Sequence, residues 1–459
     1  MRSVWASFRA RPQHVRQIRR IFICLFILLL VILYLRPYDS RVWLAIHWNF
    51  GHLVRPSLDV DRFFSEPAPF PVDLTEDVAY ILKTGYSTQE RAAAWLRTLE
   101  DESVFRDLLL VADFSTHEGG HLTRNGVPIA MDDVVALTMA KVSPLLRETS
   151  ARAEKHADLT DAIARNDTDA ALALATEFGY QMDALKFISS LDLAYQRLPH
   201  KKWYVLVDDD TYLVRGTLRQ LLGQLDSEQP FYLGNAIGGW NWRFAHGGSA
   251  VLLSQGAMRK LYVDNPDVVS EAYRISITHG WGDGHLAETL MKVRVYVEEG
   301  YRRVFNGENP YKTMIRPDRF CDPIVSFHNI KTAAQMEDIH GVYGNISEPS
   351  TWREVWGLLG APSWEAFEAE PQRGDWDHIL RPDDQTLTVE AVADAEACLR
   401  LCSEKHQSSC LAWTYFEDEN ICQLSPWMMV GEKTAYRVSG IHVKRARELA
   451  TACQSSRKR

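Results

Sequence analysis

The feature that most constrains the fold is a short apolar segment that ends in three acidic residues. Residues 203–207 (Trp-Tyr-Val-Leu-Val) are followed directly by Asp208, Asp209 and Asp210. Such a run predicts a buried strand that delivers three carboxylates at its C-terminal end. Adjacent anions repel one another, and a divalent cation such as Mg²⁺ or Mn²⁺ would relieve the repulsion because hard ions prefer carboxylate oxygens. An acidic turn at a strand end, without an ion, is the alternative interpretation.

Strand and helix patterns alternate on both sides of this segment. The alternation predicts an α/β fold with a mostly parallel sheet and helices on both faces. Ligands of such sheets bind beyond the carboxyl ends of the strands, where Asp113 and Asp210 lie. The charged stretch at 147–169 predicts an exposed insertion. The expected strands are 78–82, 107–112, 203–207, 231–233, 250–253 and 324–327, and the expected helices are 89–99, 181–197 and 257–263.

The N-terminal region indicates the secretory pathway. Six arginines and no acidic residue precede residue 21, and residues 21–35 are then uninterrupted apolar sequence. This order predicts an uncleaved signal anchor that leaves the chain beyond roughly residue 40 in the lumen. A cleaved signal peptide is the competing interpretation, but no small-residue cleavage site follows Leu35. The net charge of −9, with basic residues concentrated at the two ends, argues against a nucleic-acid partner.

Four of the seven cysteines are crowded between residues 398 and 422. In a lumenal chain this crowding predicts two disulfides in a small module, whereas a zinc site would need matching histidines and only His406 lies inside the cluster. These cysteines are Cys398, Cys402, Cys410 and Cys422. Two sequons, at Asn166 and Asn345, predict N-glycosylation.

Three further segments can complete a site around the acidic strand end. The paired glycines Gly247 and Gly248 precede a strand and let the backbone approach a ligand closely, or simply form a tight turn. Asp283 lies between two glycines at the expected start of a helix. It is either a carboxylate accessible to a ligand or the N-cap of that helix. Trp281, two residues earlier, offers a flat apolar surface. His328 ends a strand and either completes a metal site or is a structural hydrogen-bonder.

An apolar strand followed by Asp-x-Asp also occurs in phosphatases that use an aspartyl nucleophile. That pattern requires Thr or Val two places beyond the second aspartate, where this chain has Tyr212. It also requires an acid four residues beyond Asp283, where this chain has Ala287. Both tests fail. Glycoside hydrolysis, which needs two carboxylates flanking the bond, stays open at this point.

The order and spacing of these motifs resemble glycosyltransferase family 31, which includes Fringe-like and core 1 galactosyltransferase-like enzymes. The resemblance spans about residues 76–340 and rests on the acidic strand end, the stretch at 247–250, Gly282-Asp283 and the segment 321–328. Residues that resemble the fungal branch are Lys83, Arg91, Asp113, Asp183 and Lys186. The C-terminal cysteines, with Trp413 and Tyr415 between them, resemble a PAN/apple module.

The first resemblance implies a GT-A fold, a UDP-sugar donor and Mn²⁺. It implies Asp283 as the general base of an inverting transfer, and Asp208, Asp210 and His328 as metal ligands. Implied donor-binding residues are Lys83, Arg91, Asp113, Asp183, Lys186, Asp208 and Asp209. Implied acceptor- or sugar-binding residues are Trp240, Gly247, Gly248 and Trp281. The second resemblance implies the disulfides Cys398–Cys422 and Cys402–Cys410. Ser249-Ala250 departs from the Ala-Gly that usually follows the paired glycines, which leaves the acceptor open.

We therefore expect a single-pass type II protein of the Golgi or endoplasmic reticulum membrane. Its expected activity is Mn²⁺-dependent transfer of a hexose, galactose in β1,3 linkage, to a glycan or glycoprotein acceptor. An inactive glycan-binding protein acting through the PAN-like module and a metal-dependent hydrolase are the alternatives. The predicted parts are a cytosolic tail (1–20), an anchor helix (21–35), a stem (36–75), a catalytic domain (76–345), a linker (346–385), a PAN/apple-like module (386–445) and a tail (446–459). The sequence does not decide whether Cys321 and Cys453 pair.

Overall fold

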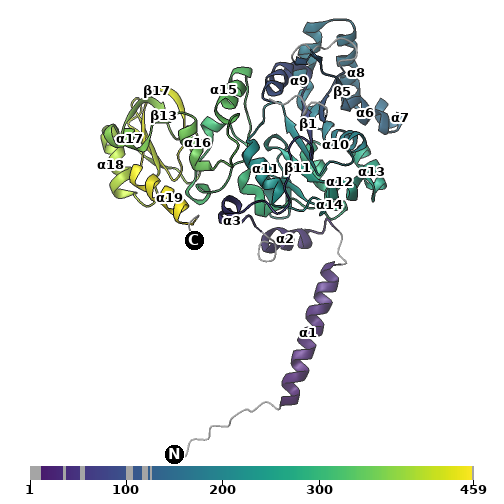
Figure 1. The fold of residues 1–459 in the computed structure, drawn as a ribbon, viewed down its shortest axis with the longest axis horizontal. Coiled ribbons are helices and arrows are strands. Elements are labelled where there is room, and N and C mark those ends of the chain that lie inside the picture. Colours follow the sequence, from purple (N-terminus) through teal and green to yellow (C-terminus); the bar gives the residue numbers. More distant parts are fainter. Residues whose placement is uncertain are drawn as a thin grey trace, which may run out of the picture.

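The computed structural model describes residues 12–34, 38–51, 57–99, 107–115, 122–124 and 127–456. Parts of the predicted cytosolic tail (1–11), stem (36–37 and 52–56) and C-terminal tail (457–459) lie outside the described residues. Figure 1 shows a large α/β body in the middle of the chain, a smaller body formed by the C-terminal residues, and helix α1 (Pro12–Tyr34) extending away from both.

A six-stranded mixed sheet forms the centre of the large body, in the order β5-β2-β1-β6-β11-β8. The pairs β5–β2, β2–β1 and β1–β6 are parallel, whereas β11 runs antiparallel to both β6 and β8. The strands are buried on both faces, which is why their sequences are nearly continuous apolar runs. Their bounds are β1 (Val78–Lys83), β2 (Leu108–Ala112), β5 (Met131–Asp133), β6 (Trp203–Asp208), β8 (Tyr232–Gly234) and β11 (Val251–Ser254).

Helices cover both faces of this sheet, as the alternating pattern predicts. Side chains that alternate along a strand point to opposite faces, so Val205 joins one apolar cluster and Leu206 the other. The Val205 face is covered by α4 (Gln89–Arg97), α11 (Arg215–Gly223), α15 (Ala333–Tyr343) and α16 (Trp352–Leu358). The Leu206 face is covered by α6 (Val134–Lys141), α10 (Lys186–Arg197), α12 (Gln255–Tyr262), α13 (Pro266–Ser276) and α14 (Gly282–Lys292).

Two sequence-based element predictions are wrong in detail. The segment 324–327 does not join the main sheet, because β12 (Ser326–Phe327) pairs antiparallel with β7 (Tyr212–Leu213) in a separate two-stranded sheet. The helix expected at 181–197 is interrupted, because α9 (Thr168–Asp183) ends and α10 begins at Lys186. Helix α8 (Ala151–Ala164) and α9 form the insertion expected around 147–169, with a small apolar cluster of their own.

The segment predicted as a stem carries two helices that pack on the α/β body. Leu44 and Trp48 of α2 (Arg41–Phe50) are buried in the cluster on the Leu206 face. The indole Nε1 of Trp43 donates a hydrogen bond to the hydroxyl of Tyr296 over 3.2 Å. Phe63 of α3 (Val60–Ser65) is buried in the apolar cluster on the Val205 face of the sheet. This part of the chain therefore belongs to the folded body.

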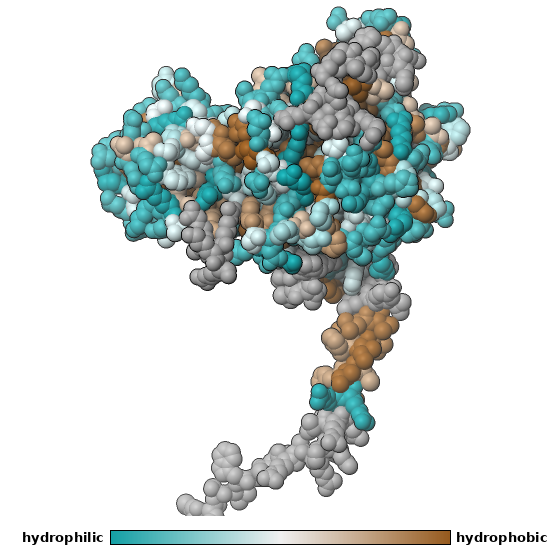
Figure 2. All heavy atoms as spheres, viewed as in Figure 1, coloured by the Kyte–Doolittle hydropathy of each residue, from teal (hydrophilic) through white to brown (hydrophobic). Residues whose placement is uncertain are grey.

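Helix α1 covers most of the segment predicted as an anchor. Its apolar side chains from Ile21 to Ile32 are about half exposed, and Figure 2 shows them as a hydrophobic surface on the projecting helix. Across the part of the chain that the structure describes, no helix combines the length and the apolar character needed to cross a membrane.

The C-terminal body is an antiparallel five-stranded sheet in the order β13-β17-β15-β16-β14, with helix α18 (Ala395–Arg400) against it. The expected disulfides Cys398–Cys422 and Cys402–Cys410 are both present, so these pairings are confirmed. Trp413 is fully buried beside them. The strands are β13 (Arg373–Asp377), β14 (Leu387–Val389), β15 (Ala412–Phe416), β16 (Ile421–Ser425) and β17 (Glu432–Ile441).

The two bodies share one apolar cluster. Ile379, Met428 and Ile441 of the C-terminal body pack in the same cluster as the α/β strands, and Ile315 exchanges backbone hydrogen bonds with Met428. A third disulfide, Cys321–Cys453, fastens helix α19 (Val443–Ser456) to the α/β body across 132 residues of sequence. The C-terminal body is thus firmly attached to the α/β body.

Removing the Cys321–Cys453 disulfide should destabilise the whole protein. Cys453→Ser is expected to lower the free energy of unfolding by about 2–5 kcal/mol, because the crosslink closes a long loop in the unfolded chain. Guanidinium unfolding followed by tryptophan fluorescence measures this change. Cys24→Ser, at the exposed free cysteine of α1, is the matched control and should leave the midpoint unchanged. An unchanged midpoint in Cys453→Ser would contradict the role given to this crosslink.

Candidate functional site

A cavity of about 690 Å³ opens at the carboxyl ends of β1, β2 and β6. Lys83 ends β1, Asp113 follows β2 and Asp208 ends β6, so the topology gathers their side chains at one edge of the sheet. The sequence-predicted residues that line the cavity are Lys83, Arg91, Asp113, Asp183, Lys186, Asp208, Asp209, Asp210, Gly247, Gly248, Trp281, Asp283 and His328. Trp240 is outside this lining and lies exposed at the turn of the hairpin formed by β9 (Ala236–Gly239) and β10 (Trp242–Ala245).

Asp210 faces two cationic groups at the edge of the cavity. Its Oδ1 lies 3.1 Å from Nε2 of His328, and its Oδ2 lies 3.0 Å from Nζ of Lys331. Burial alone would raise the pKa of Asp210, but His328 and Lys331 outweigh it and hold this pKa well below the usual range. Burial likewise would lower the pKa of His328, but the Asp210 carboxylate raises it. The Asp210 carboxylate is therefore held in its ionised form, which is the form that a cation would bind.

Asp208, Asp210 and His328 form what we call the strand-tip cluster. One potential ligand atom from each residue lies within 4.8 Å of the other two. Two carboxylates and an imidazole are a suitable donor set for Mn²⁺ and related divalent ions. Gly248 makes the arrangement possible, because a Cβ at this position would lie 2.2 Å from Nε2 of His328. Gly248 therefore accommodates the histidine ring, whereas a Cβ at Gly247 would lie 2.6 Å from Cζ of Phe187. The residues present fit a divalent metal ion.

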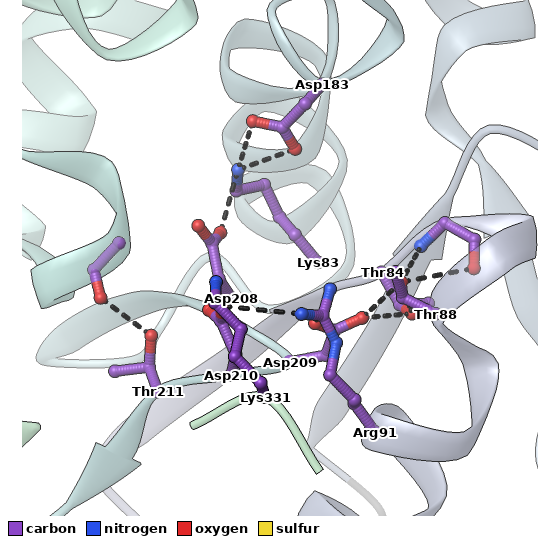
Figure 3. Close-up of polar contacts among 12 residues, drawn as sticks. Lys83, Thr84, Thr88, Arg91, Asp183, Asp208, Asp209, Asp210, Thr211 and Lys331 are labelled. Carbon is purple, nitrogen blue, oxygen red and sulfur yellow. Dashed lines mark hydrogen bonds and ion pairs between the residues drawn. The ribbon is translucent and has the colours of Figure 1, made fainter. Parts of the chain in front are cut away.

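Asp209 points away from the strand-tip cluster. Its Oδ2 accepts hydrogen bonds from the hydroxyls of Thr84 (2.6 Å) and Thr88 (2.5 Å), and its Oδ1 lies 3.0 Å from Nη2 of Arg91 (Figure 3). Burial raises the pKa of Asp209 to about 6, against the opposing effect of Arg91. These contacts connect the end of β6 to the loop after β1, and Asp209 is not among the residues of the strand-tip cluster.

Lys83 is buried between two carboxylates. Its Nζ lies 2.9 Å from both oxygens of Asp183 and 2.8 Å from Oδ1 of Asp208, as Figure 3 shows. The ammonium also lies 3.9 Å from the centre of the Phe187 ring. Burial alone would lower the pKa of Lys83, but the two aspartates outweigh it and raise this pKa. Lys83 is therefore a fixed positive charge that holds Asp208 in place beside Asp210.

Replacing Lys83 should be costly for stability. We expect Lys83→Met to lower the free energy of unfolding by about 3 kcal/mol, since loss of one partner leaves the remaining charges uncompensated. Lys202→Met is the matched control, because Lys202 forms a largely exposed pair with Asp77 at 3.0 Å and should cost less than about 1 kcal/mol. Urea unfolding of the two variants measures the difference. Equal losses of stability in the two variants would show that the buried contacts of Lys83 with Asp183 and Asp208 contribute no more than an exposed ion pair.

A second buried ion pair closes the inner end of the cavity. Nζ of Lys186 donates to the carbonyl of Thr84 over 2.6 Å and lies 3.2 Å from Oδ2 of Asp113. Asp113 also accepts a hydrogen bond from the amide of Tyr86. The break between α9 and α10 places Lys186 at the first residue of α10, from which it reaches the β1 loop. This pair shapes the floor of the cavity.

Asp283 lies across the same cavity, in the first turn of α14. Its Oδ2 accepts a hydrogen bond from the amide of Gly247 (2.9 Å), and its Oδ1 accepts one from the amide of Gly284 (2.8 Å). The N-cap interpretation is wrong, because Trp281 occupies the N-cap position and Asp283 lies inside the helix. Two backbone amides therefore orient a carboxylate that faces the cavity.

Aromatic side chains form a wall next to Asp283. The Trp281 ring is half exposed and stacks on Trp242 with ring centres 5.8 Å apart. Phe244 packs against both rings and also lines the cavity. Such a wall can stack against the apolar face of a sugar ring.

Several cavity residues were not assigned a role from the sequence. Thr84 and Thr88 reach Asp209 from more than 100 residues away, and Lys331 reaches Asp210. His246 stacks edge-on against His328 with ring centres 5.3 Å apart. The Thr-x-x-x-Thr spacing and the lysine three places after His328 were visible signals, but neither indicates a partner without the fold.

The two predicted glycosylation residues, Asn166 and Asn345, are both exposed at turns.

Comparison with protein families gives two matches. Residues 145–361 match the family model described as Fringe-like, and residues 378–439 match the model described as PAN domain. Both resemblances expected from the sequence are thereby confirmed. The Fringe-like match includes the strand-tip cluster and Asp283, whereas Lys83, Arg91 and Asp113 precede it and complete the same cavity.

Proposed function

Because this chain carries a Fringe-like glycosyltransferase domain followed by a PAN domain, we propose that it transfers a hexose from a UDP-sugar to a glycan or glycoprotein acceptor. The proposed sugar is galactose, transferred in β1,3 linkage with inversion, by a catalytic domain of GT-A type. The observation that carries this proposal is one cavity with a metal-binding carboxylate–imidazole cluster on one side and an amide-oriented carboxylate, Asp283, on the other.

On the donor side, Asp210, His328 and Asp208 would hold Mn²⁺. When bound, the ion neutralises negative charge on the departing diphosphate, a Lewis-acid contribution. Arg91 and Lys331 add positive charge at the same edge of the cavity. Lys83 pairs with Asp208 and orients its carboxylate, and the residues Asp113 and Lys186 are available to the nucleoside.

On the acceptor side, Asp283 takes the proton from the attacking hydroxyl. The amides of Gly247 and Gly284 fix its orientation, so it meets the acceptor in one geometry. Trp281 offers the acceptor sugar a stacking face. A single displacement assisted by one base inverts the anomeric centre.

We further propose that the protein is a single-pass type II protein of the Golgi or endoplasmic reticulum membrane, with the catalytic part in the lumen. The arginine-flanked apolar segment at 21–35 supports an anchor. Three disulfides support an oxidising compartment. The exposed sequons at Asn166 and Asn345 are compatible with a lumenal location.

The purified protein, incubated with a panel of UDP-sugars, Mn²⁺ and glycan acceptors, tests this proposal. We expect UDP release that depends on both metal and acceptor, highest with UDP-galactose, and a β1,3-linked product identified by NMR. Sugar binding without turnover would instead favour the glycan-binding alternative. Release of phosphate from phosphate esters would favour a metal-dependent hydrolase.

A further inference from the structure

A second group of metal-type side chains lies beside the cavity. His279, His285 and Glu288 each offer a ligand atom within 4.8 Å of the other two, and we call them the α14 cluster. His279 lies in the loop before α14, whereas His285 and Glu288 are three residues apart on that helix. Nε2 of His279 lies 3.4 Å from Oε2 of Glu288. The α14 cluster shares no residue with the strand-tip cluster.

The buried member of the α14 cluster has an unused lone pair. Nε2 of His285 lies 2.8 Å from the carbonyl oxygen of Ala272, so Nε2 carries the proton and donates it. Nδ1 of His285 is left as a bare acceptor, buried and without a hydrogen-bond partner among the described residues. The His285 side chain is 2% exposed. An unsatisfied buried acceptor costs free energy unless something binds to it.

The exposed histidine is oriented in a similar way. Nδ1 of His279 lies 2.8 Å from the carbonyl oxygen of Trp281 and 3.2 Å from the Trp281 amide nitrogen. These two contacts engage Nδ1 of His279 with the backbone of Trp281, which leaves Nε2 directed toward Glu288. Backbone carbonyls that fix the tautomer of an imidazole are typical of metal-ligating histidines.

The charges around the α14 cluster are compatible with a cation. Burial lowers the pKa of His285 to about 4, so the ring is neutral at physiological pH, as a ligand must be. The nearby cations have their own partners, since Lys292 binds Glu271 over 2.6 Å and Arg152 binds the His279 carbonyl over 2.8 Å. Glu288 supplies the negative charge.

We propose that His279, His285 and Glu288 form a second metal site, for a transition ion of the Zn²⁺ type. Two imidazoles and one carboxylate suit Zn²⁺, whereas Mn²⁺ and Mg²⁺ favour sites richer in oxygen. The side chains of His279 and Glu288 are 22% and 42% exposed, which leaves an entry path and room for a water ligand.

The position of the α14 cluster gives the ion a structural role. His279 lies before, and His285 after, the segment 280–283 that includes Trp281 and Asp283. An ion held by both histidines therefore fastens the two ends of a segment that lines the cavity. The proposed Zn²⁺ is outside the reaction and holds Trp281 and Asp283 in position.

The test is Zn²⁺ binding by the full chain without a histidine tag, stripped of metal by a chelator. His328→Ala serves as the parent, because it removes the imidazole of the strand-tip cluster. The test variants add His279→Gln or Glu288→Gln, both at partly exposed side chains, with circular dichroism to confirm folding. His200→Gln is the matched control, since His200 is exposed and outside both clusters. Competition with a chromogenic chelator gives the affinity, and atomic emission gives the metal content.

The expected result is one Zn²⁺ per parent chain and a higher melting temperature with Zn²⁺, both retained in the His200→Gln control. Each test variant should bind Zn²⁺ at least about tenfold more weakly than the parent. Removing only a hydrogen-bond partner of a metal ligand already weakens binding by about that factor, and these variants remove a ligand itself. In the test variants, Zn²⁺ should no longer raise the melting temperature. A parent that binds no added Zn²⁺, or test variants that bind it as tightly as the parent, would overturn the proposal.

Discussion

Asp283→Asn will lower kcat for sugar transfer by about 10²- to 10⁴-fold, the usual contribution of a general base. The amide keeps the size of the carboxylate and can still accept the hydrogen bond from Gly247, but it cannot take the acceptor proton. The proposed metal ligands are other residues of the cavity and are unchanged, so the affinity for UDP should stay the same. Steady-state kinetics with the preferred UDP-sugar, together with calorimetric titration of UDP, measure both quantities.

Asp267→Asn is the matched control for this prediction. Asp267 is an exposed acid in the first turn of the neighbouring helix α13 and lies outside the cavity lining, so its replacement should leave kcat within error. If Asp283→Asn retained the parent kcat, another group would have to be the base. If it lost UDP affinity and kcat together, Asp283 would belong to the donor site.

Asp210→Asn will remove most of the metal-dependent activity. Its carboxylate lies 3.1 Å from Nε2 of His328 within the strand-tip cluster, so its replacement removes a negative charge and a proposed ligand from the metal site. Metal stabilisation of a leaving group contributes several kcal/mol, which corresponds to a loss of about 10³-fold in kcat/KM. The concentration of Mn²⁺ needed for half-maximal activity should also rise. Initial rates over a Mn²⁺ titration measure both effects.

The neighbouring substitution Asp209→Asn is the control for Asp210→Asn. Asp209 is bound by Thr84, Thr88 and Arg91, and its oxygens face away from the strand-tip cluster. The Mn²⁺ concentration for half-maximal activity should therefore stay close to that of the parent. If Asp209→Asn shifted this concentration as far as Asp210→Asn does, the assignment of metal ligands within the acidic triplet would be wrong.

Much of the cavity could be predicted because its residues lie at strand ends. Asp113 and Asp208 each come directly after, or at the end of, an apolar run, and a parallel sheet brings such positions together. The partners of Asp209 could not be predicted, since Thr84 and Thr88 are separated from it by 125 and 121 residues and no local pattern links them. Lys83, Asp183 and Lys186 were expected only through the family resemblance.

Physical reasons explain why some elements could not be placed from the sequence. Residues 324–327 are as apolar as a strand of the main sheet, but hydrophobicity does not identify the pairing partner, and β12 pairs with β7. The segment 36–75 was expected to be a stem, yet Trp48 of α2 and Phe63 of α3 are buried against the α/β body. The Cys321–Cys453 pairing spans 132 residues, and spacing alone cannot predict such a bond.

The central claim is that one ion bound at the tip of β6 holds the diphosphate of the donor opposite Asp283. A crystal grown with UDP and Mn²⁺, with diffraction collected at the manganese absorption edge, tests it most directly. The expected result is a single anomalous peak within bonding distance of Asp210 and His328 and in contact with the UDP phosphates. A peak elsewhere, or bound UDP without a peak at these two residues, would contradict the claim.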